Sequence, residues 1–237
     1  MPNPKKLKKA SVIVIGAGGL GCPVLQYLVA AGTGRIAIVD FDMVDEANLQ
    51  RQILYGSDDL GKLKSIIAKN RLCQLNPMVN IEVINLRLDS SNSIRILADF
   101  DVVVDATDNL ETRYLINDSC ILLNKPMVHG AIYKFEGEFS VFNYNGGPTY
   151  RCFNPFNKKN DYRNPPPSET GLMGVLPGIT GSYMANEVIK IISGAGEVLS
   201  GKVMYFNILT NSFHLIDIKS NPENHKISKL GDLPGID

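Results

Sequence analysis

A glycine-rich turn lies near the N-terminus, between a β-branched run and an apolar segment with helical spacing. The turn reads GAGGLG over residues 16–21, after a strand expected at 11–15 and at the start of a helix expected at 19–31. Glycines let backbone N–H groups approach a phosphate closely, and a helix N-terminus favours negative charge. We therefore expect four glycines to surround nucleotide phosphates: Gly16, Gly18, Gly19 and Gly21.

An acidic residue follows the next expected strand, at 35–39. Asp40 lies 24 positions after Gly16, where a carboxylate can accept hydrogen bonds from a ribose. A GxGxxG run alone is weak evidence, because glycine turns also occur for packing reasons. The strand, the helix and the acid together predict nucleotide binding, with mononucleotide and dinucleotide both open at this point.

Two cations then favour a triphosphate. Arg51 follows the second strand, and Lys64 begins a helix expected at 63–75. They belong to the carboxyl edge of the sheet, where ligands bind in open α/β folds. Two cations suit the β- and γ-phosphates better than the pyrophosphate of a dinucleotide. The polar side chains expected beside them on this segment are Asp42, Asn48 and Gln52.

A second acidic segment, DATDN at 105–109, ends the strand expected at 101–105. A carboxylate at this edge can hold Mg²⁺ between phosphates, so we expect Asp108 to bind the metal and Asn109 to line the nucleotide site. Each of these residues also has a purely structural interpretation. Arg51 and Lys64 could be solvated surface charges, and Asp108 could cap the helix expected at 110–124. The combination favours a catalytic set of Arg51, Lys64 and Asp108.

The order of elements predicts an α/β fold. Strands alternate with helices in the first half, which indicates a Rossmann-like, doubly wound, mostly parallel sheet. The second half predicts antiparallel strands, with a strand at 137–143, a long irregular segment at 144–170, a helix at 179–193 and a hairpin at 202–218. The remaining expected elements are strands at 80–85 and 127–131 and a helix at 89–98 that opens with Asp89 as its N-cap.

Composition narrows the functional class. The 24 basic and 24 acidic residues balance, so nothing favours nucleic acid or an anionic membrane as a partner. No apolar run reaches the roughly 18 residues of a membrane span, and no signal-peptide cleavage motif follows the N-terminal lysines. Four separated cysteines form no CxxC pair. We expect a cytoplasmic globular protein, with His129 packed rather than catalytic.

Five linked runs resemble the ThiF/MoeB family: GAGGLGC, IVDFDMVDEANLQRQ, GKLK, DATDN and HGAIYKFEGEFSVF. The resemblance is ungapped over 16–109 and continues through 171–207. It implies adenylylation of the C-terminal glycine of a ubiquitin-like sulfur carrier, ThiS- or MoaD-like, in thiamine or molybdopterin synthesis, by a homodimer that uses ATP and Mg²⁺. By the same resemblance the ATP and Mg²⁺ residues are Gly19, Asp40, Arg51, Gln52, Lys64, Asp108 and Asn109, with Arg113 nearby.

The resemblance also implies an organisation. Residues 1–237 would form one adenylation domain, with a nucleotide-binding part at about 10–131. A crossover loop at about 144–170 would cover the carrier's tail, and a helix and hairpin at about 176–219 would close the fold.

Three departures from the family pattern stand out. Many relatives hold zinc with two CxxC pairs; here Pro155 stands where the partner of Cys152 would be, and no cysteine follows Asn221. We expect no zinc and an ordinary buried thiol at Cys152. Pro167 matches the crossover-loop cysteine of some relatives, so a covalent thioester step is doubtful. An N-terminal arginine that reaches the partner's ATP in relatives is missing, and the lysines at 5–9 read as a solvated charge run.

Three other functions compete with this one. A catalytically weak, carrier-binding scaffold fits the missing zinc ligands and arginine, but it would have no need for Arg51, Lys64 and Asp108. An NAD-dependent oxidoreductase accounts for the glycine turn alone. A relative that activates a tRNA-bound threonylcarbamoyl group is disfavoured by the second half of the chain and by the lack of basic excess.

Overall fold

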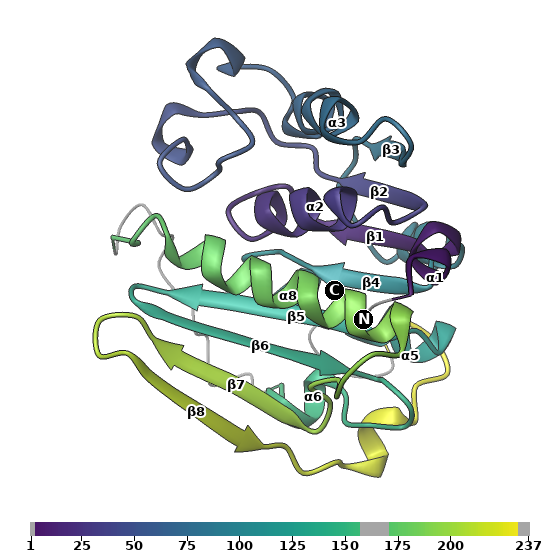
Figure 1. Ribbon diagram of the computed structural model, residues 1–237. Coiled ribbons are helices and arrows are strands. Elements are labelled where there is room, and N and C mark those ends of the chain that lie inside the picture. The colour runs from purple at the N-terminus through teal and green to yellow at the C-terminus, as the bar shows by residue number, and fades with distance from the viewer. Residues whose placement is uncertain (1–2, 157–170, 232–237) are drawn as a thin grey trace.

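A computed structural model describes residues 3–156 and 171–231. Its centre is an eight-stranded sheet of order β3-β2-β1-β4-β5-β6-β7-β8 (Figure 1). The first five strands in this order, β3, β2, β1, β4 and β5, run parallel, and β6, β7 and β8 are antiparallel to their neighbours. The strands are β1 Ser11–Ile15, β2 Arg35–Val39, β3 Asn80–Ile84, β4 Val102–Asp105, β5 Met127–Tyr133, β6 Glu136–Phe142, β7 Lys202–Asn207 and β8 Ser212–Asp217. This mixed sheet confirms the predicted fold class.

Helices cover both faces of the parallel part. Figure 1 shows α2 and α8 in front of the sheet. The described helices are α1 Pro4–Lys9, α2 Gly21–Ala30, α3 Lys64–Leu75, α4 Ser93–Leu97, α5 Leu110–Leu123, α6 Tyr150–Phe153 and α8 Leu176–Ser193, with 3-10 turns η1 Glu46–Asn48, η2 Ser57–Asp59 and η3 Pro222–His225. Among them none is long and apolar enough to cross a membrane.

Alternating residues of β1 supply two separate cores. Val12 and Val14 pack with α2, α3 and α8, whereas Ile13 and Ile15 pack with α4 and α5 on the other face. Successive strand residues point to opposite faces, so a strand buried on both sides must be apolar throughout. The sequence of β1, SVIVI, meets this requirement.

The strand order reverses beside β1. Its neighbours are β2 on one side and β4 on the other, and β4 follows β2 and β3 in the chain. The carboxyl ends of β1 and β4 therefore flank the topological switch point, which is where open α/β sheets bind ligands.

Three predicted boundaries shift in the structure. Helix α4 begins at Ser93, with Asn92 as its N-cap position, and Asp89 makes its cap-type hydrogen bonds one turn earlier, accepting from the N–H groups of Ser91 and Asn92. Helix α8 begins at Leu176, because Pro177 fits the first turn, where no N–H is needed. Helix α6 lies inside the segment expected to be irregular; residues 157–170 of that segment fall outside the described ranges.

Segments near both ends of the described chain pack against the rest of the fold. The lysine run forms α1, which buries Leu7, and Lys6 Nζ donates a hydrogen bond to the Ser193 carbonyl at 3.2 Å. At the other end η3 lies against Cys152, since Asn221 N donates to its sulfur at 3.4 Å. The four lysines of α1 are exposed, as expected for a solvated charge run, although the segment itself is helical.

Candidate active site

A large pocket opens at the carboxyl ends of the parallel strands, with a volume of about 1480 Å³. Apart from Gly21, it gathers the residues predicted from the sequence to bind the nucleotide: Gly16, Gly18, Gly19, Asp40, Asp42, Asn48, Arg51, Gln52, Lys64, Asp108 and Asn109, together with Arg113. A drug-sized ligand needs about 300–1,000 Å³, so this pocket exceeds the needs of one small molecule.

The glycine turn requires its glycines for steric reasons. Gly16 has φ +96°, and a Cβ there would lie 2.7 Å from the Ala106 carbonyl oxygen. A Cβ on Gly21 would lie 2.0 Å from the carbonyl oxygen of Gly16. Gly21 is therefore needed for the packing of the turn and does not line the pocket.

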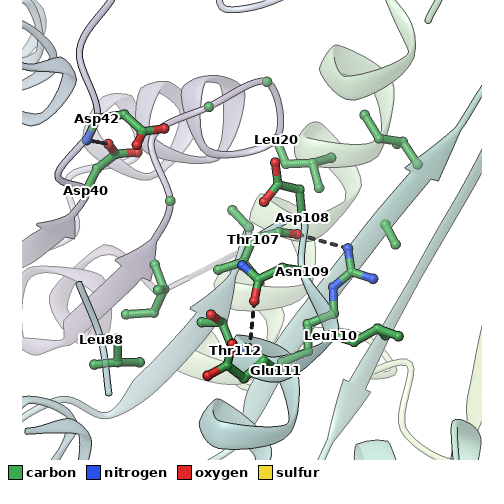
Figure 2. Close-up of a pocket in the computed structure, with 18 of the residues that line it drawn as sticks. Leu20, Asp40, Asp42, Leu88, Thr107, Asp108, Asn109, Leu110, Glu111 and Thr112 are labelled. Carbon is green, nitrogen blue, oxygen red and sulfur yellow. Dashed lines mark hydrogen bonds between the residues drawn. The ribbon is translucent and has the colours of Figure 1, made fainter. Parts of the chain in front are cut away.

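Asp40 holds the turn from one side and Tyr55 from the other. Asp40 Oδ2 accepts from Ala17 N at 2.7 Å, and Tyr55 OH donates to Ala17 O at 2.7 Å. The other Asp40 oxygen accepts from Asp42 N at 2.9 Å (Figure 2). Burial raises the pKa of Asp40, and the two backbone N–H bonds oppose that rise.

The two predicted cations are oriented by neighbours. Lys64 Nζ lies 3.0 Å from Asp42 Oδ2. Arg51 donates through Nη1 to Ala47 O and through Nη2 to Asn48 Oδ1, both at 2.9 Å. These bonds bring both cations to the pocket wall, so the reading of Lys64 as a solvated charge is wrong: it is 5% exposed.

The side chain of Gln52 places a buried acceptor atom in the same pocket wall. Its Nε2 donates to Asn48 Oδ1 at 2.8 Å, whereas its Oε1 has no hydrogen-bond partner within residues 3–156 and 171–231. A buried polar atom without a partner is costly, and a ligand donor in the pocket would satisfy it.

Asp108 faces the pocket from the turn after β4. Figure 2 shows Asp108 among the residues that line the pocket, which also include Leu20, Asp40 and Asp42. The cap of α5 is Asn109, whose Oδ1 accepts from Thr112 N at 2.9 Å, so the alternative of Asp108 as the helix cap is wrong. The Asp108 carboxylate makes no hydrogen bond or ion pair to any other described residue.

The pocket also extends over β5 and β6. The residues that line this second arm come from those strands, from α6 and from β7, and include Tyr133, Lys134, Glu136, Glu138, Tyr150, Asn154 and Tyr205. At its base lies His129, which is 1% exposed and packs against Phe142 and Tyr150 as expected. His129 Nδ1 also lies 2.7 Å from Asp105 Oδ2, a contact that the sequence analysis missed.

The residues present fit a nucleotide triphosphate with Mg²⁺. A glycine turn, two cations and the unpartnered acceptor of Gln52 face one pocket. Within the described residues no three His, Cys, Asp or Glu side chains are grouped for a metal. Mg²⁺ is usually bound through one or two carboxylates plus substrate phosphates, so Asp108 alone is a sufficient protein ligand.

The ThiF family model matches residues 2–227. The chain belongs to the ThiF family. A protein of Thermus thermophilus named "Sulfur carrier protein adenylyltransferase" is 46% identical, over 92% of this chain and 82% of its own length. A "Probable molybdopterin-synthase adenylyltransferase" of Porphyra purpurea is 48% identical over 92% of this chain, which spans 57% of that relative. These relatives confirm the predicted family.

The fold recurs in solved structures. E. coli MccB, solved with MccA-N7isoASN, superposes with a TM-score of 0.82 at 23% identity, over 92% of this chain and 67% of that one. At this identity the likeness establishes the ThiF-type fold alone.

The burial of Cys152 differs from the predicted fully buried thiol. It is half-buried rather than fully buried, and its sulfur accepts hydrogen bonds from Asn221 N at 3.4 Å and Asn224 Nδ2 at 3.6 Å. Burial raises the pKa of Cys152, but hydrogen bonds from Thr149, Asn221 and Asn224 outweigh it, and the pKa is lowered overall. Pro155 lies in the pocket wall, and Pro167 lies outside the described residues.

Proposed function

We propose that this ThiF-family chain adenylylates the C-terminal glycine carboxylate of a ubiquitin-like sulfur carrier protein, ThiS- or MoaD-like, and releases pyrophosphate, in thiamine or molybdopterin cofactor biosynthesis. One observation carries the proposal: Arg51, Lys64 and the unpaired carboxylate of Asp108 face a single pocket around the glycine turn. The name of the 46% identical Thermus relative, an adenylyltransferase of a sulfur carrier protein, agrees with this reaction.

The reaction needs no general base. A C-terminal carboxylate is ionised at neutral pH, since its pKa is about 3.3–3.7. It attacks the α-phosphorus of ATP in line, the bond to the β-phosphate oxygen breaks, and pyrophosphate leaves with that electron pair. Positioning and electrostatic stabilisation then supply most of the rate enhancement.

Each charged side chain has one role in the proposal. Arg51 and Lys64 neutralise the β- and γ-phosphates, and Asp40 accepts hydrogen bonds from the ribose. Asp108 holds Mg²⁺, which supplies positive charge to the triphosphate when bound. Gln52, Asn48 and Asp42 orient this set through the contacts described above.

The second arm of the pocket is the proposed path of the carrier's tail. It adjoins the nucleotide region in one continuous pocket, and Tyr150 and Asn154 of the proposed crossover segment line it. An extended peptide entering there reaches the Asp108 side of the site. The proposal includes a homodimer in the cytoplasm, and adenylylation without a covalent thioester step.

A carrier-binding scaffold is the competing function. The missing zinc ligands and N-terminal arginine motivate it. A scaffold, however, has no use for a buried lysine and an unpaired carboxylate at a glycine turn, and these favour the enzyme.

Pyrophosphate–ATP exchange tests the proposal. Purified ThiS-like and MoaD-like carriers are supplied separately to the wild type, to Asp108→Ala and to a control, Asp58→Ala, whose exposed carboxylate lies outside the pocket. We expect exchange with one carrier, lost in Asp108→Ala and kept in Asp58→Ala. ATP binding without exchange for either carrier would favour the scaffold.

A further inference from the structure

A buried histidine links three strands beneath the pocket. Asp105 ends β4 and pairs in register with His129 of β5, which pairs with Ser140 of β6. His129 Nδ1 lies 2.7 Å from Asp105 Oδ2, and Nε2 lies 3.7 Å from Glu138 Oε1. The side chains of His129 and Asp105 are 1% and 0% exposed, and Glu138 is 23% exposed at the pocket wall.

The charges around the ring favour an imidazolium. A neutral imidazole has one N–H, so it would satisfy Asp105 and turn a lone pair towards Glu138. A protonated ring presents an N–H to each carboxylate. Burial lowers the pKa of His129, but the hydrogen bond with Asp105 and the nearby Glu138 carboxylate outweigh it, and the pKa is raised overall. Among the described residues, Arg113 and Cys120 of α5 and Tyr150 of α6 are further titratable groups that interact with this cluster.

Asp105 connects His129 to the turn that lies in the proposed active site. Its second oxygen accepts from Thr107 N at 3.1 Å and from Thr107 Oγ1 at 2.6 Å. Arg113 Nη2 donates to Thr107 O at 2.9 Å, and Arg113 Nε lies 4.0 Å from Asp105 Oδ2. Thr107 therefore has its N–H, hydroxyl and carbonyl all fixed, and the next residue in the chain is Asp108.

We propose that His129 is a positioning residue of this enzyme: held between Asp105 and Glu138, it fixes Asp105 and thereby the turn that presents Asp108 to the pocket and that Arg113 of α5 contacts. This inference rests on the proposed function. Its alternative is simple packing against Phe142 and Tyr150, whose ring centroids lie 5.8 and 4.9 Å away. Packing explains a ring at this position, but it does not explain two carboxylates aimed at its nitrogens.

Two substitutions of similar shape, His129→Asn and His129→Leu, distinguish a positioning role from simple packing. Asn and Leu are both branched at Cγ, and the Asn amide can donate to Asp105 where the ring Nδ1 does. Positioning predicts that His129→Leu lowers kcat for carrier-dependent exchange by about tenfold to a hundredfold, because a misplaced catalytic group costs up to about 10²-fold. It also predicts a higher Mg²⁺ requirement, with His129→Asn near wild-type values for both. His214→Leu, on exposed β8, is the control.

A pH series gives an independent readout. Above the raised pKa of His129 the neutral ring still donates to Asp105 but presents no N–H to Glu138, so wild-type kcat is expected to fall only to the level of His129→Asn, whose own pH profile lacks this step. Glu138→Gln removes one carboxylate and moves the fall to lower pH. Because this variant keeps the side chain's size and the Asp105 contact, it remains informative if His129→Leu does not fold.

The outcomes are distinguishable. If the folded His129→Leu protein, or Glu138→Gln in its place, keeps wild-type kcat, Mg²⁺ requirement and pH profile, His129 only packs and the inference is overturned. If the wild type shows no exchange at all, the proposed function fails instead. Calorimetric titration with ATP at several Mg²⁺ concentrations then tests the same prediction on binding, where a His129→Leu protein with an unchanged Mg²⁺ dependence would refute it.

Discussion

Lys64 Nζ lies 3.0 Å from Asp42 Oδ2, with the lysine side chain 6% exposed and the carboxylate 55% exposed. The amine is thus aimed into the pocket by a partner that remains in solvent. Such a half-solvated pair contributes at most about 1 kcal/mol to stability. A triphosphate can therefore replace Asp42 as the partner of the Lys64 ammonium group with little loss of free energy. The pair orients Lys64 for a more highly charged ligand.

Replacing Lys64 by Met tests its phosphate contact. We expect exchange to fall about ten- to 150-fold, equivalent to about 1.5–3 kcal/mol for one charge-assisted bond. The control is Lys62→Met, because Lys62 is exposed, lies outside the pocket and donates to the Asp58 carbonyl. Equal exchange rates in the two variants would remove Lys64 from the catalytic set.

Asp108→Asn keeps the shape of the side chain and removes its charge. Since Asp108 is exposed and Asn109 caps α5, the free energy of unfolding should change by less than about 0.5 kcal/mol. Carrier-dependent exchange should nevertheless be lost, and raised Mg²⁺ should restore part of it. Urea denaturation and a Mg²⁺ titration measure the two effects; a large stability loss would mean that the carboxylate is structural.

A buried ion pair anchors α6 to α5. Arg151 contacts Asp118 through two 2.7 Å bonds, and both side chains are almost fully buried. Asp118→Asn removes the carboxylate charge from this buried pair and should lower the free energy of unfolding by about 3–5 kcal/mol. Glu223→Gln breaks an exposed 2.7 Å pair with Lys226 and should cost less than about 1 kcal/mol in the same urea experiment. Similar losses in both variants would contradict this account of burial.

His129 predicts a pH-dependent stability. Its pKa in the folded state is raised above the unfolded value of about 6.5. The stabilisation is therefore fully present below about pH 6.5 and is lost as pH rises through the folded pKa. Urea denaturation at several pH values should show the wild type losing its advantage over His129→Leu in this direction. A difference independent of pH would mean that the ring is neutral in the folded protein.

The absence of structural zinc at Cys152 stays a prediction. Its sulfur accepts bonds from Asn221 and Asn224, which tie the C-terminal segment to α6. We expect no zinc by metal analysis of the purified protein and no change in Tm with a chelator. Cys152→Val removes the acceptor and should lower Tm by a few degrees, as for about 1 kcal/mol. Stoichiometric zinc would contradict this.

The nucleotide end of the site was predictable because its signals are local. The glycine turn, Asp40 at the end of β2 and Lys64 at the start of α3 are each fixed by a strand or helix visible in nearby residues. The sheet edge then brings them together, since parallel strands share a carboxyl end.

The contacts of His129 were not predictable in the same way. They depend on the pairing of β4 with β5 and on Glu138 of a third strand. Such register is set by long-range packing, and a lone histidine in an apolar strand carries no sign of it. Asn109 rather than Asp108 caps α5 for a similar reason: both residue types cap helices well, and only the geometry of the turn decides between them.

The most direct test of the central claim is the intact mass of the carrier after incubation with the protein, ATP and Mg²⁺. The account predicts a carrier that gains one AMP, located at its C-terminal glycine, with wild-type protein and not with Asp108→Asn. A carrier lacking its last glycine should gain nothing. An unmodified carrier with both ThiS-like and MoaD-like proteins, while ATP still binds in the pocket, would contradict the claim that this chain is an adenylyltransferase of a sulfur carrier.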